Sequence, residues 1–184
     1  EGKRAIPARY DAPGMDPLPN CVQVDFAITR DDDGTWDGRV VELQAFPSLY
    51  ALMSVQSDTW SEVLNDVPGL EGDWRWSIGH EPAAAHAKIR DLLLGGCDPK
   101  EVVLVDYDPE NQKTRPDFVA TEQLYGVERL CVTKLKKQGN RLFRERDGVL
   151  VPVKRIYNRM VFDELEVKNV PVPFDWRDDL GITW

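Results

Sequence analysis

A short run of four apolar residues, VVLV at residues 102–105, constrains the fold more than any other feature of the sequence. The predicted strand is VVLVDY, residues 102–107. A run such as VVLV, which is rich in β-branched residues and apolar at every position, is typical of a strand buried on both faces. A helical pattern follows over residues 117–125 and ends at Gly126, and the apolar run RLCVT then covers residues 129–133. This order predicts a βαβ unit with parallel strands and a right-handed crossover.

Two hairpins are predicted, one on each side of this unit. Residues 21–28 (CVQVDFAI) and 39–44 (RVVELQ) mix β-branched and aromatic residues, and the segment between them has the Asp and Gly content of a hairpin connection. The second hairpin is predicted for RLFRE and VLVPVKRIY, at residues 141–145 and 149–157, which are joined by the turn RDG.

Three further helices complete the predicted fold. Residues 48–67 carry apolar residues at mostly helical spacing, with Ser48 available as the N-cap and an interruption expected near Ser57. Residues 81–96 (EPAAAHAKIRDLLLGG) end in a glycine stop, and residues 158–167 (NRMVFDELEV) have a helical pattern. Together these elements predict an α/β fold, with α+β as the alternative, in which helices pack on a mixed sheet.

The expected domain organisation is an irregular, proline-rich arm over residues 1–20 and a single α/β domain over residues 21–184. A chain of 184 residues can bury about 70% of its unfolded surface in one domain. The sequence starts at Glu1 and stops at Trp184, directly after the tryptophan-containing segment FDWRDDLGITW. We therefore expect the chain to be part of a longer protein.

The overall charge limits the partners. The formal net charge is −9 and the isoelectric point is near 4.8, so nucleic acid and anionic membrane surfaces would be repelled over most of the molecule. No apolar run approaches about 18 residues and no signal-peptide pattern is present, so we expect no membrane partner and a cytoplasmic location. Cys21, Cys97 and Cys131 lack CxxC spacing and are predicted to be structural thiols of a reducing compartment.

Several common catalytic and metal-binding patterns are missing from the sequence. His80 and His86 are six residues apart, so they cannot form the i, i+4 pair of a zinc-binding helix. No G-x-S-x-G, P-loop or G-x-G-x-x-G motif is present, and DDDGTWDG at residues 31–38 lacks the spaced ligands of a calcium loop. No metal site is predicted.

Three polar clusters remain as candidate sites. The first is Lys113, Thr114 and Arg115, between the first strand and the helix of the βαβ unit. Ligands bind outside the carboxyl ends of parallel strands, and a helix N-terminus attracts anions through free N–H groups and its dipole. This cluster is therefore a candidate anion site. The alternative is a solvated Lys113, an Arg115 paired with a nearby carboxylate, and Pro116 in the first helical turn.

The second cluster is Glu42, Gln44 and Ser48, where a strand ends and a helix begins. Polar side chains in such a place orient a ligand, or they are ordinary edge-strand and capping residues.

The third cluster is Arg155, Asn158 and Arg159, at a strand-to-helix transition. Two arginines four residues apart can clamp a carboxylate or phosphate with bidentate hydrogen bonds. The alternative is that they pair with Asp163 and Glu164 on the surface of the following helix.

The order and spacing of four motifs, VDFAI, VELQAFPSLY, VVLVDYDPENQKTRPDF and KRIYNRMVFDEL, resemble the front half of a family of ATP-grasp-like proteins. That family is related to glutathionylspermidine synthase and glutathione synthetase, and the resemblance covers roughly residues 18–184. It implies a pre-ATP-grasp domain of α/β type, followed in longer relatives by the lobes that hold ATP and Mg²⁺. Such enzymes activate a carboxylate as an acyl phosphate, which an amine attacks to give an amide-like bond.

The resemblance also implies roles for residues that match its motifs. Gln44 and Ser48 are expected to orient the substrate. The candidate substrate-binding residues also include Glu42, Thr114 and Asn158, which match the same motifs. Contact with a carboxylate or phosphate is expected from Lys113, Arg115, Arg155 and Arg159. The sequence departs from the family because it has no glycine-rich loop for nucleotide phosphates and no later acidic and asparagine pair for magnesium. The chain is therefore expected to carry no cofactor of its own and to be inactive alone.

Three functions compete at this point. The first is the substrate-side portion of an ATP-dependent carboxylate-amine ligase, docked to the part that binds ATP. The second is a non-catalytic module that binds a small anionic metabolite. The third is a structural or interaction domain, for which the six tryptophans are the support. Whether the chain belongs to an enzyme stays open.

Overall fold

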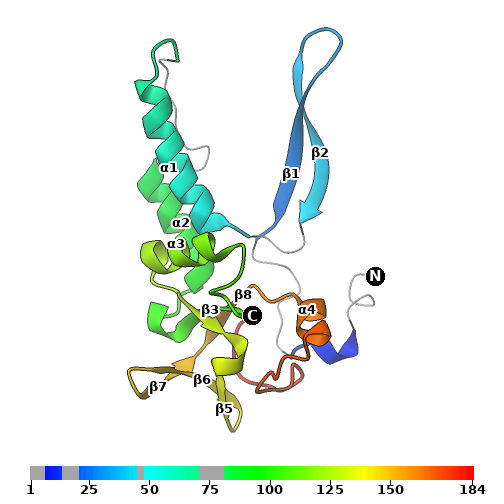
Figure 1. The fold of residues 1–184 in the computed structure, drawn as a ribbon, viewed down its shortest axis with the longest axis vertical. Helices are drawn as coiled ribbons and strands as arrows, with labels where there is room; N and C mark the ends of the chain where they lie inside the picture. The colour runs from blue at the N-terminus through cyan, green and yellow to red at the C-terminus, as the bar shows by residue number, and fades with distance from the viewer. Residues whose placement is uncertain (1–6, 14–20, 45–47, 71–80) are drawn as a thin grey trace. The chain divides into compact units, whose positions relative to one another are not determined.

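The computed structural model describes residues 7–13, 21–44, 48–70 and 81–184, and the structural statements below concern these residues (Figure 1). The chain divides into two compact units. The smaller unit is Asp16–Ser48, and the larger unit combines Glu1–Met15 with Leu49–Trp184. Each unit is described by itself.

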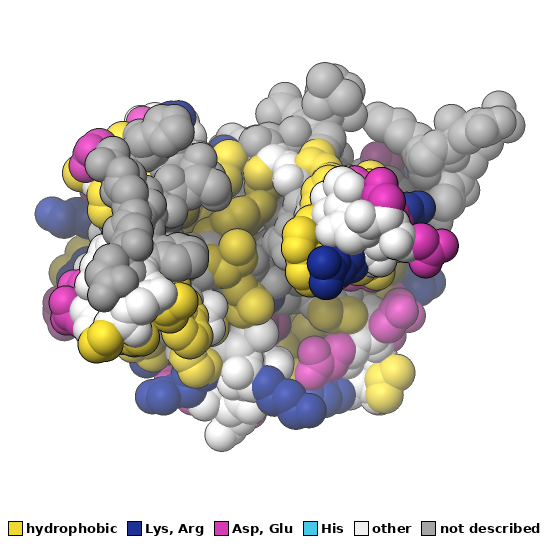
Figure 2. All heavy atoms as spheres, turned by 90° about the horizontal axis from the view of Figure 1, so that it is seen from above, with side chains coloured by type: hydrophobic (Ala, Val, Ile, Leu, Met, Phe, Trp, Pro, Cys, Tyr) yellow, Lys and Arg dark blue, Asp and Glu magenta, His cyan; other side chains and the backbone are white. Residues whose placement is uncertain are grey.

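The smaller unit is built around an antiparallel hairpin of β1 (Gln23–Arg30) and β2 (Trp36–Gln44), as predicted. The residue opposite Asp25 is Glu42 and the residue opposite Phe26 is Val40, so Val41 is the extra residue of a β-bulge. Residues directly opposite each other share a face, so one face of the hairpin is apolar and exposed, with Val24, Phe26, Ile28, Trp36, Val40 and Leu43. Figure 2 looks down on the tip of this hairpin and shows hydrophobic side chains beside charged ones.

The larger unit contains a parallel sheet in the order β4-β3-β8. Its strands are β3 (Val102–Asp106), β4 (Glu128–Cys131) and β8 (Arg155–Asn158). Helix α3 (Arg115–Tyr125) connects β3 to β4 and ends at Gly126, whose positive φ of 73° suits glycine at a helix C-cap. The predicted βαβ unit is therefore confirmed, and with it the α/β fold class.

The central sheet has a core on each of its faces. Successive side chains of a strand point to opposite sides, and Val102 and Leu104 of β3 accordingly pack in one core while Val103 and Val105 pack in the other. Helix α3 and the helices α1 (Tyr50–Asp66) and α2 (Pro82–Leu94) form the first core. The second core is completed by the third sheet, by α4 (Phe162–Val167) and by the C-terminal segment.

The third sheet is antiparallel and consists of β5 (Lys136–Gln138), β6 (Arg141–Arg146) and β7 (Val149–Val153). The expected second hairpin is present as β6 and β7. Residues 149–157, however, form two strands and not one, because the chain leaves this sheet at Lys154 and continues as β8 in the parallel sheet. In the described residues the strands thus form three separate sheets, where one mixed sheet was expected.

The described residues also form the 3-10 turns η2 (Ala8–Tyr10), η3 (Pro99–Glu101), which leads into β3, and η4 (Val132–Lys134), which follows β4. Helix α1 runs through Ser57 without the expected interruption. Its N-cap residue is Leu49, with a left-handed φ of 65°, so the expectation that Ser48 caps this helix is wrong. Helix α4 starts later than predicted because its first predicted residue, Asn158, closes strand β8.

Two expectations from the composition concern cysteines and membranes. All three cysteines lie in the described part of the chain, are half-buried and form no disulfide bond. Among the residues that the structure covers, no helix combines the length and the apolar character that crossing a membrane requires.

Candidate functional site

The parallel pairing of β3 with β8 brings two of the motifs to one edge of the sheet. Val105 lies opposite Asn158, and the N–H of Arg159 donates to the carbonyl oxygen of Val105 at 2.9 Å. The strands are parallel, so both end at the same edge, where the loop of residues 107–114 also begins (Figure 1). In open α/β sheets this carboxyl edge is where ligands bind.

The start of α1 reaches the same place through Asp117, in the first turn of α3. The side chain of Asp117 is fully buried, and its Oδ1 atom accepts a hydrogen bond from the N–H of Leu52 at 3.0 Å. Leu49, the N-cap of α1, provides no side-chain acceptor, so Asp117 serves as the cap of α1 from another helix. The N-terminus of α1, the N-terminus of α3 and the end of β8 therefore meet.

Asp117 has an unusual environment for a carboxylate. Burial raises its pKa, while the backbone N–H groups at the start of α1 and the charge of Arg159 act in the opposite direction. Its second oxygen, Oδ2, is buried and has no hydrogen-bond partner among the described residues.

Arg159 acts electrostatically on two acidic residues. Its side chain is buried, and its guanidinium carbon is 6.0 Å from the centre of the Phe118 ring. Burial raises the pKa of both Asp106 and Asp117, and the charge of Arg159 opposes this rise. We refer to Asp106, Asp117, Asn158 and Arg159 as the edge cluster. Within it, one arginine compensates two buried carboxyl groups.

Asp106 is the last residue of β3 and is 5% exposed. Burial raises its pKa from 3.8 to about 6. Three groups oppose this rise: the N–H of Tyr107, which donates to Oδ1 at 2.7 Å, and the charges of Arg159 and Lys168. Glu164 acts in the same direction as burial. The charge of the edge cluster therefore changes between pH 5 and 7.

The first predicted cluster is divided by the structure. Lys113 is exposed, and no ion pair of this residue is found in the described part. Arg115 instead donates to Oε2 of Glu110 at 3.0 Å, and Glu110 is shared with Arg129, which lowers the pKa of Glu110 to about 2. The alternative interpretation of Arg115 is thus the observed one.

The first turn of α3 offers few backbone donors to an anion. Thr114 is the N-cap by position, but its hydroxyl makes no capping hydrogen bond and its carbonyl oxygen accepts from the N–H of Asp117 at 2.9 Å. The N–H of Arg115 donates to Gln112, and Pro116 has no N–H. Contact with an anion at this edge therefore depends on side chains, and Lys113 is an exposed lysine of this loop that makes no ion pair with the described residues.

Arg155 faces away from the edge, at the start of β8. Its Nε atom donates to the carbonyl oxygen of Leu93 at 2.9 Å and its Nη2 atom to that of Leu92 at 3.2 Å. These are unsatisfied carbonyls at the C-terminus of α2, so Arg155 caps that helix.

Asn158 does lie at the edge, and its Oδ1 atom accepts from the N–H of Met160 at 3.0 Å. Of the two acidic partners proposed for the arginines, Glu164 pairs with Lys168 at 2.6 Å.

The second predicted cluster belongs to the hairpin unit. Gln44 donates to Asp25 of β1 at 2.8 Å and to Glu42 of its own strand at 3.3 Å. The first of these hydrogen bonds links the two strands on their polar face. The N–H of Ser48 donates to Oε1 of Gln23 at 3.4 Å. These contacts hold the hairpin together and lie within the smaller unit.

Asp106 and Asp117 were not among the predicted site residues. Asp106 could have been found as the polar residue that ends an otherwise apolar strand. Asp117 gives no such signal, because an acidic residue in a first helical turn is common.

In the residues that the structure describes, no three His, Cys, Asp or Glu side chains are arranged to hold a metal ion. No family model matches the sequence, and no curated protein matches it.

Proposed function

We propose that the chain is the substrate-side portion of an ATP-dependent carboxylate-amine ligase. The observation that supports this proposal is the convergence of two motifs, VVLVDYDPENQKTRPDF and KRIYNRMVFDEL, and of the start of α1 at the carboxyl edge of the parallel sheet. Two helix N-termini, two carboxyl groups and an arginine lie together there, and in open α/β folds this is the edge at which ligands bind.

In this proposal the chain binds and orients a substrate carboxylate. Lys113 contacts the carboxylate from the loop, and the backbone N–H of Arg159, bonded to the carbonyl oxygen of Val105, holds the end of β8 against β3. In the full-length enzyme, transfer of the terminal phosphoryl group of ATP to this carboxylate gives an acyl phosphate and ADP. The amine then attacks the acyl carbon, loses a proton, and releases phosphate. The contribution of this chain is positioning, which can supply a large part of a rate enhancement.

Asp106 adds a proton acceptor to this edge. A carboxyl group with a pKa of about 6 is largely ionised at pH 7 and can still exchange a proton with a neighbouring amine. The attacking amine must lose a proton, so Asp106 is the residue of the edge cluster that suits this role.

The test is ADP release by the full-length protein that this proposal implies. Release should require both a carboxylate and an amine, and Lys113→Met should lower kcat/KM about tenfold, the value of one weakened ionic contact. ADP release that is independent of both substrates would contradict the proposal. The chain alone should release no ADP.

A binding module without turnover is the second candidate. It is favoured by one observation, that the edge cluster is assembled from residues of this chain alone. The two candidates differ in a single measurement, since only the ligase couples ligand binding to ADP release.

A further inference from the structure

The hairpin of β1 and β2 exposes one apolar face, and no other strand of the described residues pairs with it. Its residues are 40% to 70% exposed, and we call them the apolar hairpin face: Val24, Phe26, Ile28, Trp36, Val40 and Leu43. A two-stranded hairpin is at best marginally stable in water unless its apolar face packs against another surface. This face therefore needs a cover.

The shape of the face suits a flat partner. Gly38 lies opposite Ile28, and a Cβ at Gly38 would be 3.6 Å from Cδ1 of Phe26, so the Phe26 ring lies beside a position that has no side chain. Two sheets with apolar faces pack on each other at a spacing of about 10 Å. A second hairpin of this kind therefore offers a matching surface.

The charges of the hairpin leave this face accessible to an apolar partner. The carboxylates of the two strands lie on the other face: Asp25, Asp37 and Glu42. Arg30 is on the apolar side, but its Nε atom donates to the carbonyl oxygen of Gly34 at 3.1 Å and its guanidinium carbon is 5.7 Å from the centre of the Trp36 ring. Two copies of a chain with net charge −9 repel each other over most of their surface, whereas contact through this face brings no strand carboxylates together.

We propose that the apolar hairpin face binds the same face of a second copy of this chain, related by a two-fold axis. Large apolar side chains that are about half exposed leave roughly 100 Å² each in contact with water. Two sets of six would bury about 1,200 Å² in total, the lower limit of a stable protein–protein interface. A two-fold contact closes on itself, so association stops at the dimer. The proposal goes beyond the ligase function and shares no residue with the edge cluster.

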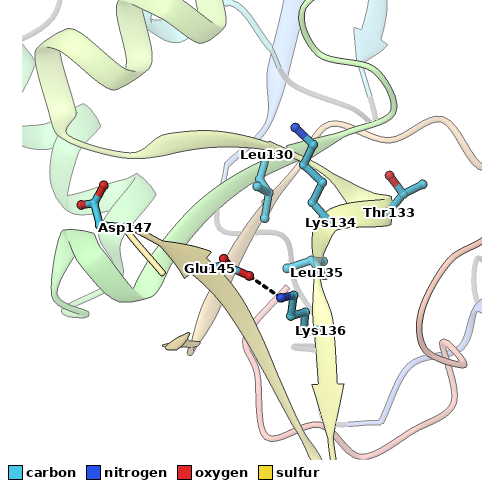
Figure 3. Close-up of a pocket in the computed structure, with 7 residues that line it drawn as sticks. All are labelled: Leu130, Thr133, Lys134, Leu135, Lys136, Glu145 and Asp147. Carbon is cyan, nitrogen blue, oxygen red and sulfur yellow. Dashed lines mark hydrogen bonds and ion pairs between the residues drawn. The ribbon is translucent and has the colours of Figure 1, made fainter. Parts of the chain in front are cut away.

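A head-to-tail contact would need an apolar receptor elsewhere on the chain. The pocket of about 400 Å³ beside the end of β4 does not provide one, because two lysines and two carboxylates line it, Lys134, Lys136, Glu145 and Asp147 (Figure 3). An apolar face placed over these groups would remove their water without offering hydrogen bonds in return. The exposed Trp60 of α1 is a second candidate receptor, and it is separated from the two-fold contact by substitution.

Sedimentation equilibrium of the chain measures the association. We expect dimers to form at a protein concentration of about 100 µM, as for an interface at the lower end of the stable size range. Added salt should strengthen the dimer, because it screens the repulsion between two chains of charge −9 and the interface contains no ion pair. A chain that stays monomeric at this concentration, or a dimer that salt weakens, would overturn the proposal.

Adjacent residues of β1 provide a matched pair of variants, because their side chains point to opposite faces. Ile28→Glu should weaken dimerisation at least about 100-fold, since two unpaired carboxylates would be buried in the interface. Ala27→Glu places the same charge on the other face and should weaken it less than about threefold. Both residues are exposed in the single chain, so both variants should keep the wild-type far-ultraviolet circular dichroism.

Trp60→Glu tests the head-to-tail contact and should leave dimerisation unchanged. Equal effects of Ile28→Glu and Ala27→Glu, loss of association in Trp60→Glu, or oligomers larger than the dimer would each contradict two-fold pairing through the apolar hairpin face.

Discussion

The carboxylate of Asp117 in α3 accepts a hydrogen bond from the backbone N–H of Leu52 in α1, 65 residues earlier in the chain. A helix normally takes its cap from a residue adjacent in sequence. Here the two helix N-termini share one buried carboxyl group, so the start of α1 is fixed against the carboxyl edge of the parallel sheet. The packing of α1 and the geometry of the edge cluster therefore depend on the same side chain.

Removal of this shared cap should destabilise the protein. We expect Asp117→Ala to lower the free energy of unfolding by about 2 kcal/mol, because the N–H groups of α1 lose a buried acceptor. Asp117→Asn keeps one acceptor oxygen and should lose about 1 kcal/mol. Urea denaturation measures both. Asp66→Ala, at an exposed residue of the same α1, should change stability by less than about 0.5 kcal/mol, and an equal effect of Asp117→Ala and Asp66→Ala would refute the shared cap.

Asp106 should make stability depend on pH. Its pKa is about 6 in the folded protein and 3.8 is the ordinary value, so between these values the folded state binds more protons than the unfolded state. The contribution of Asp106 to the free energy of unfolding therefore falls as the pH rises from about 4 to 6 and is constant above that window. Asp106→Asn should gain stability relative to the wild type across this window. Denaturation curves at pH 4.5 and 7.5 that shift equally in both proteins would show that Asp106 has no raised pKa.

Arg155 should behave as a structural residue. Arg155→Met removes two hydrogen bonds from the C-terminus of α2 and should lower the free energy of unfolding by about 2 kcal/mol. Gly95→Ala should act on the same contact, because a Cβ at Gly95 would lie 2.7 Å from Nη1 of Arg155 and the φ there is +54°. Ligand affinity of the folded Arg155→Met protein should be unchanged. A loss of affinity without a loss of stability would place Arg155 in the binding site after all.

Arg144 should be the most costly single charge to remove. It is 1% exposed, donates to the carbonyl oxygen of Lys100 at 2.9 and 3.2 Å, and pairs with Glu128, so it joins β6 to the parallel sheet. Arg144→Met should cost about 3 kcal/mol, because Glu128 and the carbonyl group lose their partner. The exposed Arg141 on the same strand is the matched control, and Arg141→Met should cost less than about 0.5 kcal/mol. Thermal unfolding of the two variants gives their free energies of unfolding at a common temperature. Similar losses in the two variants would contradict this prediction.

The βαβ unit was predictable because its signals are local. The apolar run of β3, Pro116 at the start of α3 and Gly126 at its end each limit the chain where they stand. The separation of β7 from β8 was not predicted, since the two charged residues Lys154 and Arg155 can also lie within one strand of VLVPVKRIY. The break is made by a distant contact, in which the N–H of Lys154 donates to the carbonyl oxygen of Glu101.

The carboxyl edge of the sheet could be located from the sequence, but the contacts of the side chains there could not. A loop after a parallel strand indicated the carboxyl edge, and Lys113 and Asn158 lie there. The partners of the arginines were not predictable, because Arg115 meets Glu110 and Arg155 meets the end of α2 only in the folded chain. The same reason hides Asp117, whose partner is 65 residues away.

Titration of the chain with small carboxylates, followed by calorimetry, tests the central claim that the carboxyl edge binds such a ligand. We predict that at least one carboxylate binds, that Lys113→Met weakens it about tenfold, and that Lys88→Met does not change it. Lys134→Met, at an exposed lysine of η4, should also leave this affinity unchanged. Binding that is insensitive to Lys113→Met, or no binding of any carboxylate, would contradict the account.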